Sequence, residues 1–170
     1  LPGDFIFAYK LPFGFQPPLS GGERIGGRAP HRGEVVIFKC PADSSLSCIK
    51  RVIGLPGDRI EIRGKRLMIN RKRAAYREAR GFDLGTVASG MRAAVLEEAW
   101  GKFRHHILVG TSRTTENFGP LVVPPGHFFV LSDNRDHEED SRKWGFIPFR
   151  SLEARAGFVW LSLGWREGQK

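Results

Sequence analysis

The chain has 170 residues, of which 41% are apolar and 26% are charged, a composition that excludes a disordered chain. This length allows one core, or one core with an inserted subdomain. The net charge of +9 favours an anionic partner, such as a membrane surface or a nucleic acid. The 21 glycines and 11 prolines indicate tight turns between short strands, so we expect a mostly β fold.

Two apolar strands are predicted early in the chain. Glu34–Lys39 and Cys48–Ile53 are rich in β-branched and aromatic residues, and a loop that begins at Pro41 separates them, so we expect a hairpin. Cys40 and Cys48 would lie on facing strands, which leaves a disulfide and two free thiols both open. Two cysteines without suitably spaced histidines are too few for a zinc site, so we expect no metal.

A turn and a basic segment follow. Leu55–Asp58 has proline and glycine at the middle positions of a type II turn, which leads into a short strand over Arg59–Ile62. Residues 59–80 contain nine basic and two acidic side chains, a local net charge of +7. Beyond them, apolar residues recur every four positions between Val87 and Phe103, which predicts an amphipathic helix.

These observations divide the chain into a core and an insertion. We predict a β core of residues 1–63 and 118–170, interrupted by a smaller basic subdomain of residues 64–117 that contains the short helix. Two apolar strands of the core, His127–Leu131 and Gly157–Leu161, lie on either side of a dense charged loop.

Lys50 is the residue that most needs an explanation, because it lies within an apolar strand. Loss of hydration penalises a buried ammonium and favours the neutral amine. A neutral lysine is a suitable general base, and serine–lysine pairs use one to take the proton of a serine hydroxyl. The alternative is an ordinary strand lysine whose stem packs while its head reaches water.

The lysine lies in one of four ordered stretches of marked composition: Arg32–Phe38, Ile49–Asp58, Ser132–Arg142 and Trp144–Pro148. In order and separation they resemble the sequence boxes of type I signal peptidases, the serine–lysine leader peptidases of the bacterial cytoplasmic membrane. The resemblance implies an antiparallel β-sheet core of the signal-peptidase type and a serine endopeptidase without a cofactor. Its substrates would be preprotein signal peptides with small residues at the first and third positions before the cleaved bond. It would act on the periplasmic side of the membrane.

The resemblance also implies roles for individual residues. Lys50 matches the general base, and Ile37, Cys48 and Ile49 match walls of the substrate pockets. Ion pairs of Asp133 with Arg51 and of Asp140 with Arg142 would stiffen the floor beneath the lysine. The residues expected to support the site are Arg51, Asp133, Asn134, Arg135, Glu138, Asp140, Ser141 and Arg142.

The sequence departs from the family pattern at three places. Leu1–Asp4 resembles the end of the box that carries the nucleophilic serine, so we expect that serine upstream of residue 1 and the printed chain to be an inactive fragment. A naturally shortened relative is the weaker alternative. Ser132 stands where the family usually has glycine, and Glu138 where it has a small hydroxyl residue. A carboxylate beside Lys50 would favour the protonated amine, so we expect Glu138 to face solvent.

The charge pattern leaves several partners to consider. The basic insertion suits anionic lipid headgroups, or it is a solvated face without a partner. Phe13, Phe15, Trp160 and Trp165 are candidate membrane anchors. Alternatives are a conjugation or pilin-maturation peptidase with the same dyad, a non-catalytic relative that holds preproteins, and a basic β-domain that binds nucleic acid. We do not expect nucleic acid, because no strand interleaves aromatic residues for base stacking.

Overall fold

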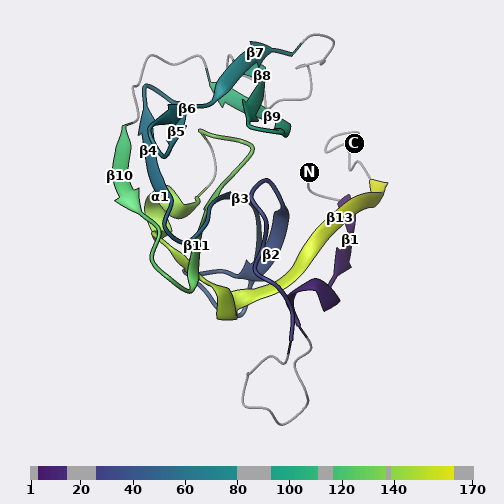
Figure 1. Cartoon of the computed structure of the whole chain (residues 1–170). Coiled ribbons are helices and arrows are strands. Elements are labelled where there is room, and N and C mark those ends of the chain that lie inside the picture. The colour runs from purple at the N-terminus through teal and green to yellow at the C-terminus, as the bar shows by residue number, and fades with distance from the viewer. Residues whose placement is uncertain (1–3, 15–25, 80–92, 111–116, 137–138, 163–170) are drawn as a thin grey trace. The chain divides into compact units, whose positions relative to one another are not determined.

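The regular structure of the chain is mostly antiparallel β-strand, as the sequence predicts (Figure 1). The computed structural model describes residues 4–14, 26–79, 93–110, 117–136 and 139–162. The chain forms two compact units. The first contains Leu1–Pro30, Glu34–Ile49 and Arg150–Lys170, and the second contains His31–Gly33 and Lys50–Phe149.

The first unit joins segments from opposite ends of the sequence in one sheet. β1 (Asp4–Tyr9) pairs antiparallel with β13 (Leu152–Ser162), and β13 pairs antiparallel with β2 (Val35–Lys39). Figure 1 shows the purple β1 beside the yellow β13. In β2, Val36 and Phe38 are fully buried and alternate with less buried residues, as expected for a strand with one face on a core.

A short 3-10 helix, η1 (Leu11–Phe13), follows β1 and buries the ring of Phe13. Phe13 is only 5% exposed, so the expectation that it is a membrane anchor is wrong: its ring closes the interior of the unit. Its neighbours Phe7 and Leu11 are exposed instead, at 50% and 81%. The other proposed anchors lie outside the described side chains: Phe15, Trp160 and Trp165.

A disulfide joins Cys40 and Cys48 and settles the choice that the sequence leaves open. The backbone N–H of Cys40 also donates to the carbonyl of Leu46 (3.0 Å). One covalent bond and one hydrogen bond therefore close the loop between β2 and β3 (Ser47–Gly54), the loop predicted between the two apolar strands.

The second unit contains β3 from Lys50 onward, next to a strand from much later in the chain. β3 pairs antiparallel with β11 (His127–Leu131), with Val52 opposite Val130. β11 also pairs with the short strand β12 (Ile147–Pro148). Four consecutive residues of β11 are buried, which agrees with the apolar strand predicted there.

A second sheet of this unit forms around β4 (Arg59–Arg63). β4 lies between β10 (Phe118–Val122) and β5 (Arg66–Ile69), and β6 (Lys72–Arg73) continues the sheet beyond β5. One apolar cluster joins this sheet to β3 and β11. Its buried members are Ile53, Ile60, Ile62, Leu67, Ile69, Ala74, Val123, Phe129 and Leu131.

Glycine-dependent turns connect these strands. The predicted turn at Leu55–Asp58 is confirmed, because the N–H of Asp58 donates to the carbonyl of Leu55 (2.9 Å) and Gly57 has a φ of +85°. That φ is the one a type II turn requires at its third position. Between β4 and β5, Gly64 and Lys65 both have positive φ, the conformation of a two-residue hairpin turn.

The predicted helix between Val87 and Phe103 is wrong where the structure describes this segment. A three-stranded sheet contains β7 (Ala75–Glu78), β8 (Ala93–Trp100) and β9 (Phe103–Gly110), in that order. Apolar residues four positions apart share one face of a strand as well as of a helix, because four is a multiple of the strand period of two. Gly101, with a φ of +60°, starts the tight turn between β8 and β9. Residues 80–92 lie outside the described residues.

The predicted boundaries of the core and the basic subdomain, residues 1–63 and 118–170 against 64–117, differ from the two compact units and stay a prediction. Within the described parts of the chain, no helix has the length and apolar character needed to cross a membrane.

Candidate active site

The pairing of β3 with β11 fixes where the stretch Ser132–Arg142, here called the charged segment, begins. Arg51 lies opposite Leu131, the last residue of β11, so the segment from Ser132 onward leaves the sheet at the level of Lys50. Residues about 80 positions apart in the sequence are thereby brought to one place. In the sequence, Lys50 lies in one apolar strand and Ser132 follows another. The antiparallel pairing of these two strands brings the two residues to the same level of the sheet.

Lys50 is buried within β3, with an exposed fraction of 9%. Its side-chain nitrogen lies 6.0 Å from the centre of the Trp144 ring. The indole N–H of Trp144 donates to Glu139 Oε2 (3.2 Å), and Lys143 donates to the other carboxylate oxygen. The hydrogen bond from Lys143, that from Trp144 and the charges of Lys143 and Lys50 hold the pKa of Glu139 below its usual range.

Arg51, the residue after the lysine, forms the ion pair that the resemblance implies. Its Nε and one terminal nitrogen donate to the two carboxylate oxygens of Asp133, at 2.8 and 2.6 Å. Its other terminal nitrogen donates to the carbonyl of Gly33 (2.8 Å). This two-point contact fixes the plane of the Arg51 guanidinium. It therefore holds Arg51, the neighbour of Lys50 in β3, in one orientation.

The second expected ion pair is also present. Arg142 donates to both carboxylate oxygens of Asp140, at 2.9 and 2.8 Å, and its backbone N–H donates to Asp140 Oδ1 (3.0 Å). Asp140 caps α1 (Ser141–Trp144) and accepts the backbone N–H of Ser132. The hydroxyl of Ser141 accepts the N–H of Val130 (3.0 Å). These bonds attach α1 and its capping residue to Val130 of β11 and to Ser132, which follows β11.

Arg135 and Glu98 form a buried ion pair that sequence reasoning missed. The terminal nitrogens of Arg135 lie 3.0 and 2.6 Å from the two carboxylate oxygens of Glu98, which is 1% exposed. The hydroxyl of Tyr76 donates to Glu98 Oε1 (2.5 Å). His105 Nε2 lies 3.3 Å from Glu98 Oε2 without the alignment of a hydrogen bond.

Electrostatics explain the protonation states in this cluster. Burial alone raises the pKa of Glu98, but the contact with His105 and the charge and hydrogen bonds of Arg135 outweigh it and lower that pKa to about 2. Burial and the charge of Glu98 raise the pKa of the Tyr76 hydroxyl, which therefore keeps its proton and donates it. Glu98 is thus a buried carboxylate with an arginine as its main counter-charge.

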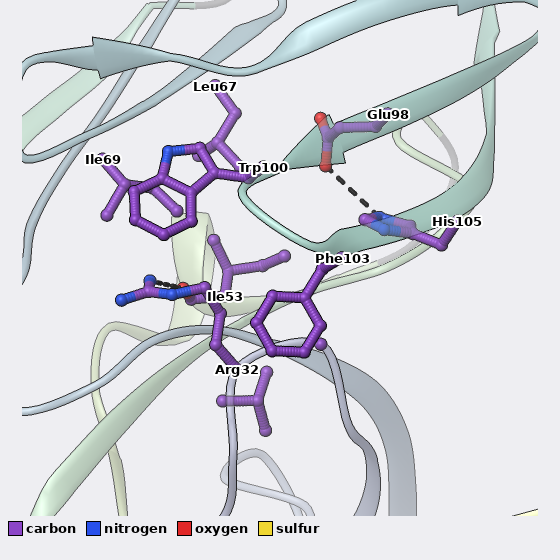
Figure 2. Close-up of a pocket in the computed structure, with 10 residues that line it drawn as sticks. Arg32, Ile53, Leu67, Ile69, Glu98, Trp100, Phe103 and His105 are labelled. Carbon is purple, nitrogen blue, oxygen red and sulfur yellow. Dashed lines mark hydrogen bonds and ion pairs between the residues drawn. The ribbon is translucent and has the colours of Figure 1, made fainter.

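A small pocket lies beside this cluster (Figure 2). Its walls are mainly apolar, with Trp100 and Phe103 facing the pocket together with side chains of β3 and β5. The guanidinium of Arg32 lies 4.5 Å from the centre of the Trp100 ring and also pairs with Asp58 (2.7 Å). The Lys50 side chain does not line this pocket, so we do not place the reaction there.

The remaining predicted residues are placed as follows. Asn134 forms an isolated bridge with Leu108 of β9. Ile37, Cys48 and Ile49 belong to the first unit: Ile37 and Cys48 are half-buried and Ile49 is 41% exposed. Glu138 lies outside the described residues, so its expected orientation stays a prediction. The described residues contain no group of three side chains that could ligate a metal ion.

Comparisons with known proteins agree on one family. The family pattern described as signal peptidase, peptidase S26, matches residues 1–161. Signal peptidase I of Pseudomonas aeruginosa is 34% identical over 172 residues, which cover 94% of this chain and 59% of that relative. Signal peptidase I of Rickettsia typhi is 34% identical over 181 residues, with coverage of 95% and 67%.

A solved structure of a signal peptidase I from Enterococcus faecalis aligns with a TM-score of 0.48 and 26% identity, over 75% of this chain and 97% of that chain. The chain spans 59% of the length of the Pseudomonas aeruginosa relative. Because the family pattern covers nearly the whole sequence, the chain belongs to the signal peptidase family, peptidase S26.

Proposed function

We propose that the protein cleaves signal peptides from exported preproteins, with Lys50 as the general base of a serine–lysine dyad. The observation that carries this proposal is a lysine 9% exposed in β3, at the point where the charged segment leaves β11. Membership of the signal peptidase family supports the reaction class. The ion pairs of Arg51 and Arg142 support the role of the surrounding residues as a rigid frame.

The reaction would follow the course of serine acyl transfer. The neutral amine of Lys50 takes the hydroxyl proton while the serine oxygen attacks the scissile carbonyl carbon. The ammonium then gives this proton to the leaving amine as the peptide bond breaks, and an acyl-enzyme remains. Water, deprotonated by the same amine, then attacks the acyl carbon. The ester bond to the serine breaks, and the ammonium returns its proton to the serine oxygen. In this reaction Lys50 supplies the base, and the residues around it supply the frame.

Two ion pairs would hold the base in position. Arg51 is adjacent to Lys50 in β3, so its bond to Asp133 fixes the backbone that carries the amine. Trp144, on the helix capped by Asp140, places an aromatic ring 6.0 Å from the amine nitrogen. We assign Asn134, Arg135 and Ser141 to the same frame, because each bonds to β9 or β11 or lies in the cluster with Glu98.

The substrate would bind as an extended peptide. We propose Ile37, Cys48 and Ile49 as walls of shallow apolar pockets, which accept small side chains at the first and third positions before the cleaved bond. Cys48 and Ile49 precede Lys50 in the sequence of β3, and an extended peptide commonly binds along such a strand. The disulfide at Cys48 would hold that part of the strand in one conformation.

We also propose that the protein works at the periplasmic face of a bacterial cytoplasmic membrane. The exposed rings and side chains near β1, Phe7 at 50% and Leu11 at 81%, suit the interface between headgroups and acyl chains. Exposed basic side chains suit anionic headgroups. They are Arg63, Arg66, Arg71, Lys72, Arg73 and Arg77.

The test is a peptidase assay on the enzyme with its natural upstream residues. We expect cleavage of a peptide that carries an Ala-x-Ala sequence, and a loss of at least about a thousandfold in kcat for Lys50→Met, which keeps the stem and removes the amine. Lys102→Met is the matched control, because Lys102 is exposed in the turn after β8 and has no role in this proposal. Unchanged turnover in Lys50→Met would exclude this lysine as the base.

A further inference from the structure

Glu98 and Arg135 are more deeply buried than a strand glutamate and a loop arginine usually are. Glu98 is 1% exposed and Arg135 is 5% exposed. Both carboxylate oxygens of Glu98 accept from Arg135, and Tyr76 supplies a further donor. The reaction proposed above uses neither residue directly, so the ion pair requires its own explanation.

Arg135 forms two hydrogen bonds within the charged segment and one to β9. Its Nε donates to the carbonyl of Ser132 (3.0 Å). Its backbone N–H donates to the carbonyl of Leu108 on β9 (2.9 Å), and its own carbonyl accepts from Arg142 (2.6 Å). Arg135 therefore connects Ser132, Arg142 and β9 by hydrogen bonds. Its ion pair with Glu98 holds its guanidinium in place.

The charged segment carries a second carboxylate close to this arginine in the sequence, that of Asp133. Asp133 is two residues away, and its backbone carbonyl accepts the N–H of Leu108, the residue that also bonds to Arg135. Burial lowers the pKa of Arg135, but the charge and hydrogen bonds of Glu98 outweigh it, and Tyr76 and then Asp133 raise this pKa further. Asp133 is at present bound at two points to Arg51, beside Lys50.

We propose that Glu98 is a positioning residue of the peptidase reaction: by neutralising Arg135, it leaves Asp133 bound to Arg51 and so keeps Lys50 aligned. This proposal rests on the proposed function for its catalytic consequence. A buried arginine without its carboxylate is strongly destabilised and takes the nearest remaining anion. In this proposal that anion is Asp133, and its loss from Arg51 would release the residue next to the base.

The adjacent residue in β8 provides a matched control. Glu97 carries the same charge and pairs with Arg104 (3.2 Å), but the side chains of this pair are 28% and 63% exposed. Glu97→Gln removes one carboxylate from the same strand without leaving a buried cation. An effect of Glu98→Gln that Glu97→Gln does not share therefore depends on the buried pair.

The direct experiment measures the hydrogen exchange of the Arg51 Nε–H by NMR in the 170-residue chain, and it needs no nucleophile. We expect Glu98→Gln to speed this exchange about tenfold, the factor for losing one charge-assisted hydrogen bond, and Glu97→Gln to leave it unchanged. In the double variant Glu98→Gln/Arg135→Gln, no buried cation competes for Asp133, so the slow exchange should return. Equal exchange in Glu98→Gln and wild type would overturn the proposal. If Glu98→Gln fails to fold, fast exchange in the double variant overturns it.

The catalytic consequence is measured in the enzyme with its upstream residues. We expect Glu98→Gln to lower kcat at least about tenfold with KM within about twofold. The double variant should recover part of kcat, because it removes the competing cation but also the bond of Arg135 to the carbonyl of Ser132. A kcat unchanged in Glu98→Gln would refute the catalytic part of the proposal. A wild-type enzyme without peptidase activity would refute the proposed function, while the exchange of the Arg51 Nε–H would still decide the positioning of Asp133.

Discussion

The two units of the chain are stabilised by different interactions. In the first unit, a disulfide closes the loop before β3, and the ion pair of Lys39 with Glu153 lies near the surface, with side chains 46% and 25% exposed. In the second unit, the charges of Glu98, Arg135 and Asp140 are almost completely buried. Buried charges are stable only while each keeps its partners, whereas exposed pairs contribute little. The second unit should therefore be far more sensitive to the loss of a single charge.

The largest expected effect comes from replacing the arginine of the buried ion pair between Arg135 and Glu98. Arg135→Met leaves the carboxylate of Glu98, 1% exposed, without its main counter-charge. We expect the free energy of unfolding to fall by about 3–5 kcal/mol, as for other buried pairs that lose one partner. Urea denaturation measures it. Removing both charges in Arg135→Met/Glu98→Gln should restore part of the loss, and a double variant no more stable than Arg135→Met would contradict this account.

Acid should weaken the second unit through the same carboxylate. The folded protein lowers the pKa of Glu98 from 4.5 to about 2, so the unfolded chain binds this proton more readily. The carboxylate therefore contributes stability above pH 4.5, and this contribution disappears as the pH falls toward about 2. A shift of this size corresponds to up to about 3 kcal/mol.

Urea midpoints measured at intervals between pH 6 and pH 2 follow this loss. The informative comparison is with Glu98→Gln, which has no proton to bind at this position and should show a shallower decline with acid. If the two proteins lose stability in parallel over this range, Glu98 does not carry the effect.

The sequence predicts the ion pairs of the site whose residues lie in the family-like boxes, but it misses a partner that lies outside them. The pairs Arg51–Asp133 and Asp140–Arg142 are predicted because their residues lie in boxes that resemble a known family. Glu98 is not among the residues predicted from the sequence, because its role depends on pairing with Arg135, 37 residues later. Nothing in the local pattern distinguishes it from Glu97.

The fold shows the same limit. Apolar residues at intervals of four positions predicted a helix, and the described part of that segment forms two strands joined at Gly101. The glycine was the available signal for a turn, and a hairpin prediction would have placed Glu98 opposite His105, its actual partner in the β8–β9 register. By contrast, the turn at Leu55–Asp58 was predicted correctly, because proline and glycine fix its backbone locally.

The smallest expected effect is in the first unit, on removal of the disulfide. Cys40 and Cys48 are eight positions apart, so their bond restricts a short loop of the unfolded chain and contributes about 2.5 kcal/mol. Cys40→Ser/Cys48→Ser should therefore lower amide protection from hydrogen exchange in β2 and β13. The amides of β4 and β5, which lie in the buried core of the second unit, should keep theirs because they depend on different contacts. Equal losses of protection in both units would contradict the prediction that the disulfide stabilises the first unit alone.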